Sequence, residues 1–199
     1  MGKVYTGASM SLDGYIAGYD GSGFDQLFQW YGNGDVSVPT ADPGMTFSLT
    51  PESAAHWAAI REQTAVLVVG RRLFDFTNGW NGNHPLGLPV VVVTHAAPED
   101  WAHPDAPFTF VSGGIEAAIA RAQQIAGDKV VAVNGGTIAS QCAHAGLLDE
   151  VWVDLVPVVL GGGVPLLRTL GAGPIVLDGP LEHTQGNRVT HLRFAVRKG

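Results

Sequence analysis

The feature that most constrains this fold is a series of short apolar runs, each of which stops at a glycine or a turn that leads into a helical pattern. Residues 65–69 read Ala-Val-Leu-Val-Val and stop at Gly70, and residues 90–93 are four consecutive valines. Runs of this length without polar alternation are typical of strands in a parallel sheet whose two faces are both covered by helices. The sequence therefore predicts an α/β fold.

The order of the predicted elements extends this pattern into an architecture. Strands are predicted at residues 4–10, 65–69, 88–94, 108–111, 129–133 and 149–159, and helices at residues 50–63, 71–76, 115–126 and 137–145. Two further strands, residues 175–185 and 188–196, are joined by Gly186-Asn187, a favoured hairpin turn. We expect three layers: a mixed, mostly parallel sheet with helices on both faces and an antiparallel hairpin at the C-terminus. Residues 18–48, rich in Gly, Asp and Asn, are expected to form an irregular loop, with regular structure allowed only around residues 24–30.

Composition limits the domain count and the partners. With 199 residues, 46% of them hydrophobic, the chain is expected to form a single domain over residues 1–199. The net charge is −7 and the eleven Lys and Arg residues are scattered, which disfavours nucleic acid as a partner. The sequence lacks an apolar stretch of membrane-spanning length, and residues 1–14 lack a signal-peptide pattern, so we expect a cytoplasmic protein without a membrane partner. The single cysteine, Cys142, excludes an internal disulfide and is interpreted as an inert thiol, and no metal site is predicted.

Two glycines at a strand-to-helix boundary form the strongest local signal for a ligand. A predicted buried strand runs into Gly135 and Gly136, and a helix follows at once. Without side chains these residues let a pyrophosphate approach the backbone, and the free amides of Thr137 and Ile138 offer it partial positive charge. A tight structural turn explains the glycines equally well, and the GxGxxG spacing of Rossmann dinucleotide sites is absent.

A second strand breaks in the same way, into a helix whose first residues are basic: Gly70 is followed by Arg71 and Arg72. Two guanidinium groups at a helix start oppose the helix dipole, so a bound anion such as a 2′-phosphate explains them better than stability does. The alternative is a solvated pair that offsets the acidic excess. Thr94 and His95 end the neighbouring strand, at the sheet edge where open α/β sheets bind ligands. They could hold a phosphate or ribose, although turn chemistry also explains them.

Four short segments, taken in order along the chain, match a family pattern. They are Ser-Met-Ser-Leu-Asp-Gly-Tyr-Ile-Ala at residues 9–17, Val-Gly-Arg-Arg at residues 69–72, Val-Asn-Gly-Gly at residues 133–136 and Leu-Leu-Asp-Glu-Val at residues 147–151. In this combination they resemble the reductase domain of bacterial riboflavin biosynthesis and its stand-alone relatives, the dihydrofolate-reductase family proteins. The similarity extends over nearly the whole chain, from Val4 to Val196.

The resemblance implies a dihydrofolate-reductase-like fold that binds NADPH. The cofactor contacts that it implies are Gly70, Arg71 and Arg72 at the adenosine phosphate end, Thr94 and His95 at the 2′-phosphate, Gly135, Gly136, Thr137 and Ile138 at the pyrophosphate, and Ile16. It also implies that the loop with Asp13 lies beside the nicotinamide and the substrate, which makes Asp13 the candidate catalytic or substrate-orienting acid. Taken alone, an aspartate in a tight turn is usually a turn former.

The chain also departs from these relatives. The riboflavin reductase is commonly fused to a zinc deaminase, and this sequence lacks the His-x-Glu and Pro-Cys-x-x-Cys signature of that chemistry. In dihydrofolate reductase a carboxylate early in the helix before the Gly-Arg unit engages the pterin; here Glu52 lies in the first turn, and the alignment is ambiguous by several residues. The aromatic segment 24–31 resembles neither relative and indicates a different substrate.

We therefore predict an NADPH-dependent oxidoreductase that transfers a hydride to a small substrate, a pterin, a ribosylamino-pyrimidine or a similar C=N or C=O compound. Asp13 is expected to donate a proton, directly or through water, or to hydrogen-bond the substrate. Trp30 and Val156 are the expected substrate contacts, and the apolar strand near residues 151–167 is expected to pair two subunits in a homodimer. Two alternatives stay open: a flavin- or deazaflavin-dependent reductase, and a nucleotide-binding module without turnover.

Overall fold

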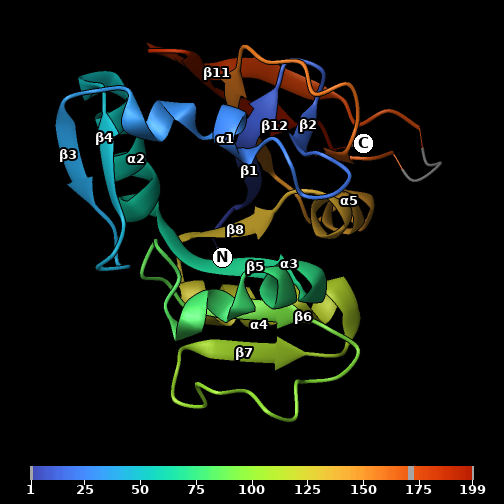
Figure 1. The fold of residues 1–199 in the computed structure, drawn as a ribbon. Coiled ribbons are helices and arrows are strands. Elements are labelled where there is room, and N and C mark those ends of the chain that lie inside the picture. Colours follow the sequence, from blue (N-terminus) through green and yellow to red (C-terminus); the bar gives the residue numbers. More distant parts are fainter. Residues whose placement is uncertain (1, 170–172, 199) are drawn as a thin grey trace.

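The computed structural model describes residues 2–169 and 173–198, and a twisted eight-stranded sheet forms its centre (Figure 1). The strands are β1 (Val4–Ser11), β5 (Thr64–Gly70), β6 (Val90–Val93), β7 (Phe108–Val111), β8 (Val130–Asn134), β9 (Glu150–Val156), β11 (Leu177–Gly186) and β12 (Val189–Val196). Their order across the sheet is β11-β12-β9-β1-β8-β5-β6-β7, and neighbours run parallel except in the pairs β11–β12 and β12–β9. The predicted mixed, mostly parallel sheet with a C-terminal hairpin is confirmed.

Helices cover both faces of this sheet, as predicted. They are α1 (Phe24–Leu27), α2 (Pro51–Gln63), α3 (Arg71–Phe76), α4 (Gly114–Ala126) and α5 (Thr137–His144). Helices α4 and α5 lie on one face, where Ile119 and Val68 belong to the same core cluster. Helices α2 and α3 lie on the other face, where Phe74 and Leu67 share a second cluster. Leu67 and Val68 point to opposite faces because side chains alternate along a strand, which is why the run that contains them is apolar throughout.

The start of α2 follows the local chemistry of its sequence. Thr50 precedes the helix in an extended conformation, and its side chain accepts a hydrogen bond from the backbone N–H of Ser53 at 3.3 Å. Pro51 occupies the first turn, where its missing N–H costs nothing. This cap fixes where α2 begins, and so fixes which α2 side chains face the sheet.

The expectation of a mostly irregular loop over residues 18–48 is wrong in part. Helix α1 and a 3-10 turn (Gln29–Gly32) fall around residues 24–30, where regular structure was allowed. A small hairpin of β3 (Val36–Pro39) and β4 (Thr46–Leu49) was not predicted. In β4 the side chains of Phe47 and Leu49 are buried and their neighbours are exposed, which is the alternation of a half-buried strand. The strands are only four residues long, and the Gly- and Asp-rich residues around them hide that alternation in the sequence.

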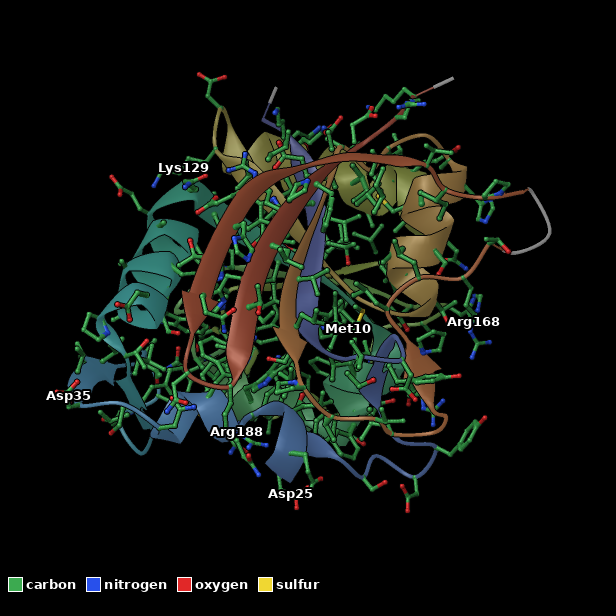
Figure 2. All side chains as sticks on the ribbon, turned by 90° about the horizontal axis from the view of Figure 1, so that it is seen from above. Met10, Asp25, Asp35, Lys129, Arg168 and Arg188 are labelled. Atoms are coloured by element: carbon green, nitrogen blue, oxygen red, sulfur yellow. The ribbon has the colours of Figure 1, made fainter. Side chains whose placement is uncertain are left out.

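Two expectations for the C-terminal half also need correction. The turn of the last hairpin is Asn187-Arg188, one residue later than predicted, because Gly186 pairs with Val189. Figure 2 shows the hairpin tip, marked by Arg188. The tip contacts the segment after α1, where Asn33 Nδ2 donates to the carbonyl oxygen of Asn187 at 2.6 Å. Strand β9 has β1 and β12 as neighbours on its two sides, so its edge cannot pair with a second subunit. The homodimer remains a prediction, and only edge-to-edge pairing through β9 is excluded.

Two further features of the described residues concern Cys142 and the length of the helices. Cys142 is fully buried on α5, and burial raises the pKa of its thiol to about 12, so the thiol stays protonated. Within residues 2–169 and 173–198, none of the helices has the length and apolar character needed to cross a bilayer.

Candidate functional site

A cavity of about 280 Å³ opens on the face of the sheet that carries α2 and α3. Its base is formed by the middle and carboxyl-terminal parts of β1, β5, β8 and β9, with Ser9, Asn134 and Asp154 among the lining residues. His56 and Trp57 from α2 line one side, and the α3 region lines another. A volume of this size is close to the lower end for small-molecule sites.

The base of the cavity lies next to the two glycine turns, at Gly70 and at Gly135, that the sequence singles out. Val69 lines the cavity and Gly70 follows it at the end of β5; Asn134 lines the cavity and Gly135 follows it at the end of β8. Strands β5 and β8 are parallel neighbours, so their carboxyl ends lie together. The contact is close, because a Cβ added to Gly70 would lie 3.0 Å from Cγ1 of Ile138. The starts of α3 and α5 therefore share one edge of the sheet.

The diglycine turn is also required by the chain's own packing. A Cβ on Gly135 would lie 2.8 Å from Cδ1 of Ile16 and 2.9 Å from Cδ1 of Leu166. Gly136 has φ 86° and donates its N–H to the carbonyl oxygen of Leu166 at 2.8 Å. No side chain caps α5, so the amides of its first turn, including that of the exposed Thr137, lack a side-chain acceptor. The glycines are thus required for packing, and the free amides that follow them can still bind an anion.

Arg71 has more partners within the protein than the sequence led us to expect. Its Nε donates to Asp75 Oδ1 at 2.7 Å, and its Nη1 donates to the carbonyl oxygen of Ala96 at 2.8 Å. These bonds tie α3 to the loop after β6. The charge of Arg71 near the helix start therefore has a structural explanation.

The other basic and polar residues at this edge differ in exposure. Thr94 is buried, and its hydroxyl donates to the carbonyl oxygen of Ala96 at 2.7 Å, so it stabilises the loop after β6. Arg72 and His95 are exposed. Arg72 makes no ion pair among the described residues. Of this group, Arg72 and His95 are therefore the side chains free to meet an anion.

Asp13 is held by three donors. Its carboxylate accepts from Ser11 Oγ at 2.6 Å, from the N–H of Leu160 at 3.1 Å and from the N–H of Gly161 at 2.7 Å. The hydrogen bond from Ser11, supported by the backbone bonds, lowers the pKa of Asp13 below its usual value. The side chain is exposed and does not line the cavity. This arrangement suits an anchor for residues 160–161 better than a proton donor.

The two expected substrate contacts need correction. Trp30 and Val156 are only 1% and 2% exposed and belong to the core under α1 and β4. The indole N–H of Trp30 is used in a hydrogen bond to Ser9 Oγ at 2.9 Å. Phe28 and Tyr31 line the cavity instead. The sequence singled out the aromatic segment 24–31, but in this turn the buried and the exposed positions cannot be told apart without the fold.

A buried polar cluster beside the cavity was missed in the sequence. Asp154 Oδ1 lies 2.7 Å from Nδ1 of His191 and 3.0 Å from Nε2 of His56. The two imidazole rings stack at 3.9 Å between centroids, and Nε2 of His191 lies 2.9 Å from Ser53 Oγ. The residues come from β9, β12 and α2, far apart in the chain. The only local signal was a single carboxylate within the apolar strand Val-Trp-Val-Asp-Leu-Val.

The cluster holds Asp154 as an anion. Burial raises the pKa of its carboxyl, but the hydrogen bonds from His191 and His56 outweigh that effect and bring the pKa down to about 2. The ligand atoms of His56, Asp154 and His191 lie within 4.8 Å of one another, close enough for a metal ion. However, Oδ1 itself lies at hydrogen-bond distance from both ring nitrogens, so ring N–H donors account for the spacing.

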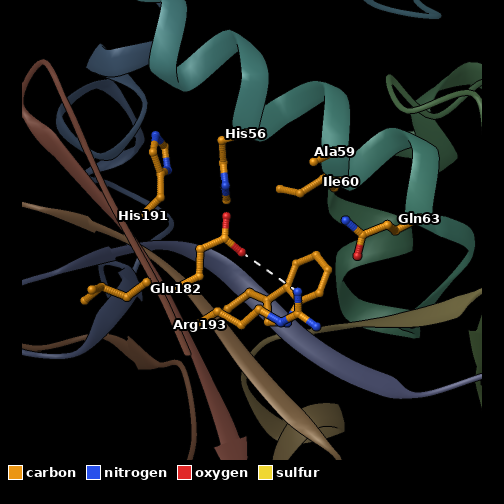
Figure 3. A pocket seen from close by; sticks show the side chains of 9 residues that line it. His56, Ala59, Ile60, Gln63, Glu182, His191 and Arg193 are labelled. Carbon is orange, nitrogen blue, oxygen red and sulfur yellow. Dashed lines mark ion pairs between the residues drawn. The ribbon is translucent and has the colours of Figure 1, made fainter. Parts of the chain in front are cut away.

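The cluster also borders a second hollow, between α2 and the C-terminal hairpin (Figure 3). Figure 3 shows His56 on α2 and His191 on β12 at its wall, and a dashed line joins Glu182 to Arg193. In this ion pair Nη1 of Arg193 lies 3.8 Å from Oε2 of Glu182. This hollow measures about 20 Å³, room for little more than a water molecule. The larger cavity is therefore the candidate substrate site.

The fold combines a parallel-sheet core with an antiparallel C-terminal hairpin, and its cavity opens toward two helices that each begin directly after a glycine. These features define a dihydrofolate-reductase-like α/β protein. The model of the RibD C-terminal domain matches residues 3–175, and the chain belongs to this family of reductase-type domains. This family assignment confirms the resemblance drawn from the four sequence segments.

Individual relatives are distant. An uncharacterized protein of Bacillus subtilis, YwjB, is 25% identical over 162 residues, which cover 81% of this chain and 80% of that protein. A putative riboflavin biosynthesis protein from Shewanella sp. PV-4 is 23% identical with a TM-score of 0.74, over 98% of this chain and 99% of that one. Dihydrofolate reductase from Enterococcus faecalis, in complex with NADP(H), is 13% identical with a TM-score of 0.52, over 98% and 97%. The two structures support the fold.

Proposed function

We propose that the protein is an NADPH-dependent reductase that transfers a hydride to a C=N or C=O bond of a small substrate, such as a pterin or a ribosylamino-pyrimidine. The observation that carries this proposal is the continuity between the cavity and the adjacent starts of α3 and α5. The NADP(H) named for the Enterococcus enzyme supports the choice of cofactor. When bound, NADPH supplies the hydride.

The residues at this edge fit such a cofactor. The first amides of α5, at Thr137 and Ile138, have no side-chain cap and would bind the pyrophosphate, which Gly135 and Gly136 allow to come close. Arg72, exposed at the start of α3, would bind the 2′-phosphate that distinguishes NADPH from NADH. The chain itself has to orient a substrate in the cavity, exclude water from it and deliver one proton.

Titration of the purified protein with NADPH and NADH, followed by nucleotide fluorescence, tests the proposal. We expect NADPH to bind more tightly than NADH, and Arg72→Gln to weaken NADPH by about tenfold while leaving NADH unchanged, since one charge-assisted contact is lost. Arg121→Gln, at an exposed arginine of α4, is the matched control. If NADPH does not bind at millimolar concentration, or if a flavin binds in its place, the proposal fails.

A further inference from the structure

The proposed reaction needs one proton, and Asp13 is poorly placed to deliver it. A C=N or C=O bond that accepts a hydride at carbon takes up a proton at its nitrogen or oxygen. Asp13 is held by three donors and does not line the cavity. The titratable side chains among the described residues that do line it are Tyr5, Tyr31, His56, His84 and Asp154.

Four of these five side chains are unsuited to give up a proton at neutral pH. Burial raises the pKa of Tyr5 to about 12 and also raises the pKa of Tyr31, so both hydroxyls keep their protons. Burial lowers the pKa of His84 to about 4, so this ring stays neutral. Asp154 is an anion, because the hydrogen bonds from the two imidazoles outweigh the effect of burial on its pKa. The remaining candidate is His56.

His56 has one ring nitrogen engaged and one available. Nε2 lies 3.0 Å from Asp154 Oδ1, whereas Nδ1 has no hydrogen-bond partner among the described residues. In that part of the chain, Nε1 of Trp57 is the one sealed side-chain nitrogen or oxygen that lacks a partner, so Nδ1 of His56 is not sealed within the protein. The side chain is 12% exposed, and it lines both the cavity and the smaller hollow of Figure 3. Water and a ligand can therefore reach the ring.

The surroundings of His56 supply an anion for a charged ring. Asp154 on β9 contacts Nε2, and an anion at this distance stabilises a positive charge on an imidazole. His191 on β12 stacks on the ring and lies between Asp154 and Ser53, an arrangement that a neutral imidazole satisfies with one donor and one acceptor. The other titratable or charged groups that line the two spaces beside His56 are Tyr5 on β1, Tyr31, His84, Glu182 on β11 and Arg193 on β12. The last two form an ion pair with each other.

We propose that His56 is the catalytic acid of this site. The proton leaves Nδ1 of its imidazolium, directly or through one water molecule, for the nitrogen or oxygen of the bond that accepts the hydride. His56 becomes neutral in this step and regains its proton from water. Asp154 is a positioning residue, which orients the ring through Nε2 and offsets its charge. This inference rests on the proposed function, whose proton donor it names.

Chemical reactivity tests the free nitrogen without any substrate. Diethyl pyrocarbonate acylates neutral imidazole nitrogens that it can reach, and peptide mass spectrometry locates the modified histidines. In the full chain we expect His56 to react clearly faster than His191, whose ring nitrogens are both hydrogen-bonded and whose side chain is 1% exposed. His183, exposed on β11, is the positive control. Equal protection of His56 and His191 would overturn the proposal.

Turnover tests the catalytic role, with dihydropterin as the C=N probe and the loss of NADPH fluorescence as the signal. His56→Gln should slow hydride transfer by about a hundredfold, because a general acid is lost, and should leave NADPH affinity unchanged. Imidazole in the buffer should restore part of the rate in His56→Ala, which a merely structural role does not predict. His183→Gln is the matched control and should keep the full rate. An unchanged rate in His56→Gln would overturn the proposal.

The positioning role has its own readout. Asp154→Asn removes the anion but keeps an oxygen that can accept a hydrogen bond from Nε2. We expect the pH at which hydride transfer is fastest to fall in this variant, because positive charge on the ring loses its partner. A merely structural role would lower the rate without moving that pH. A protein that binds NADPH but protects His56 as well as His191 would refute this inference alone, and a reactive His56 in a protein that ignores NADPH would refute the cofactor assignment alone.

Discussion

Glu150 forms a buried ion network whose loss should be measurable as a pH-dependent change in stability. Its side chain is 2% exposed and accepts hydrogen bonds from Arg193 Nε at 2.6 Å, from Lys3 Nζ at 2.7 Å and from Trp152 Nε1 at 2.7 Å. The guanidinium carbon of Arg193 also lies 4.7 Å from the centroid of the Trp152 ring. Glu150→Gln keeps the size of the side chain and removes its charge.

The magnitude follows from the pKa of Glu150. Burial raises it, but the hydrogen bonds from Arg193, Lys3 and Trp152 outweigh burial and lower it from 4.5 to about 2. At about 1.4 kcal/mol per pH unit this amounts to roughly 3.5 kcal/mol, which solvent screening of the exposed Lys3 reduces to about 2 kcal/mol. Because the folded pKa is the lower one, the ionised carboxylate stabilises the fold above pH 4.5, and this stability is lost as the pH falls from 4.5 toward 2.

Urea denaturation of both proteins between pH 7 and pH 3 measures the effect. We expect Glu150→Gln to lower the free energy of unfolding by about 2 kcal/mol at pH 7, and by clearly less at pH 3. Glu99→Gln, at an exposed glutamate, is the control and should change little at either pH. A loss of the same size at both pH values would show that shape, and not charge, is what Glu150 contributes, and would refute the argument.

Two further predictions concern single side chains. Asp13→Ala should speed hydrogen exchange at the amides of Leu160 and Gly161, whose N–H groups it binds, while Asp25→Ala should not; unchanged exchange in Asp13→Ala would contradict the anchoring role. Burial lowers the pKa of His84 from 6.5 to about 4, so protonation of the unfolded chain should reduce stability as the pH falls from 6.5 to 4, by roughly 3.5 kcal/mol. His84→Gln should remove that part of the pH dependence, and a persistent slope in its denaturation curves would assign it to other groups.

The framework of the sheet could be predicted because its signals are local. Every residue from Val66 to Val69 is apolar because both faces of β5 are covered by other parts of the protein, and Gly70 ends the run where α3 starts. The same logic located Gly135 and α5. Once both strands are assigned to one parallel sheet, their carboxyl ends must lie on one edge, so the shared location of the glycine turns also follows.

The polar cluster could not be predicted because its residues come from separate elements and are brought together only by the pairing of strands. Positions 56, 154 and 191 meet only when β9 pairs with β12 in one register, and no pattern within any of the three segments records that pairing. The prediction that Trp30 contacts the substrate is wrong for a related reason. In a short 3-10 turn, neither a period of two nor a period of 3.6 residues marks which aromatic side chain is buried.

The register of β9 and β12 links the stability network to the candidate site. Trp152 lies opposite Arg193 and Asp154 lies opposite His191, so alternate residues of β9 meet cationic or imidazole side chains on one face of the sheet. A slip of one residue would turn both partners to the other face, so that Glu150 would lose Arg193 and Asp154 would lose His191, at a cost that fixes the register. The position of His191 beside Asp154 therefore depends on this register, because only the pairing of β9 with β12 brings Nδ1 of His191 within 2.7 Å of Asp154 Oδ1.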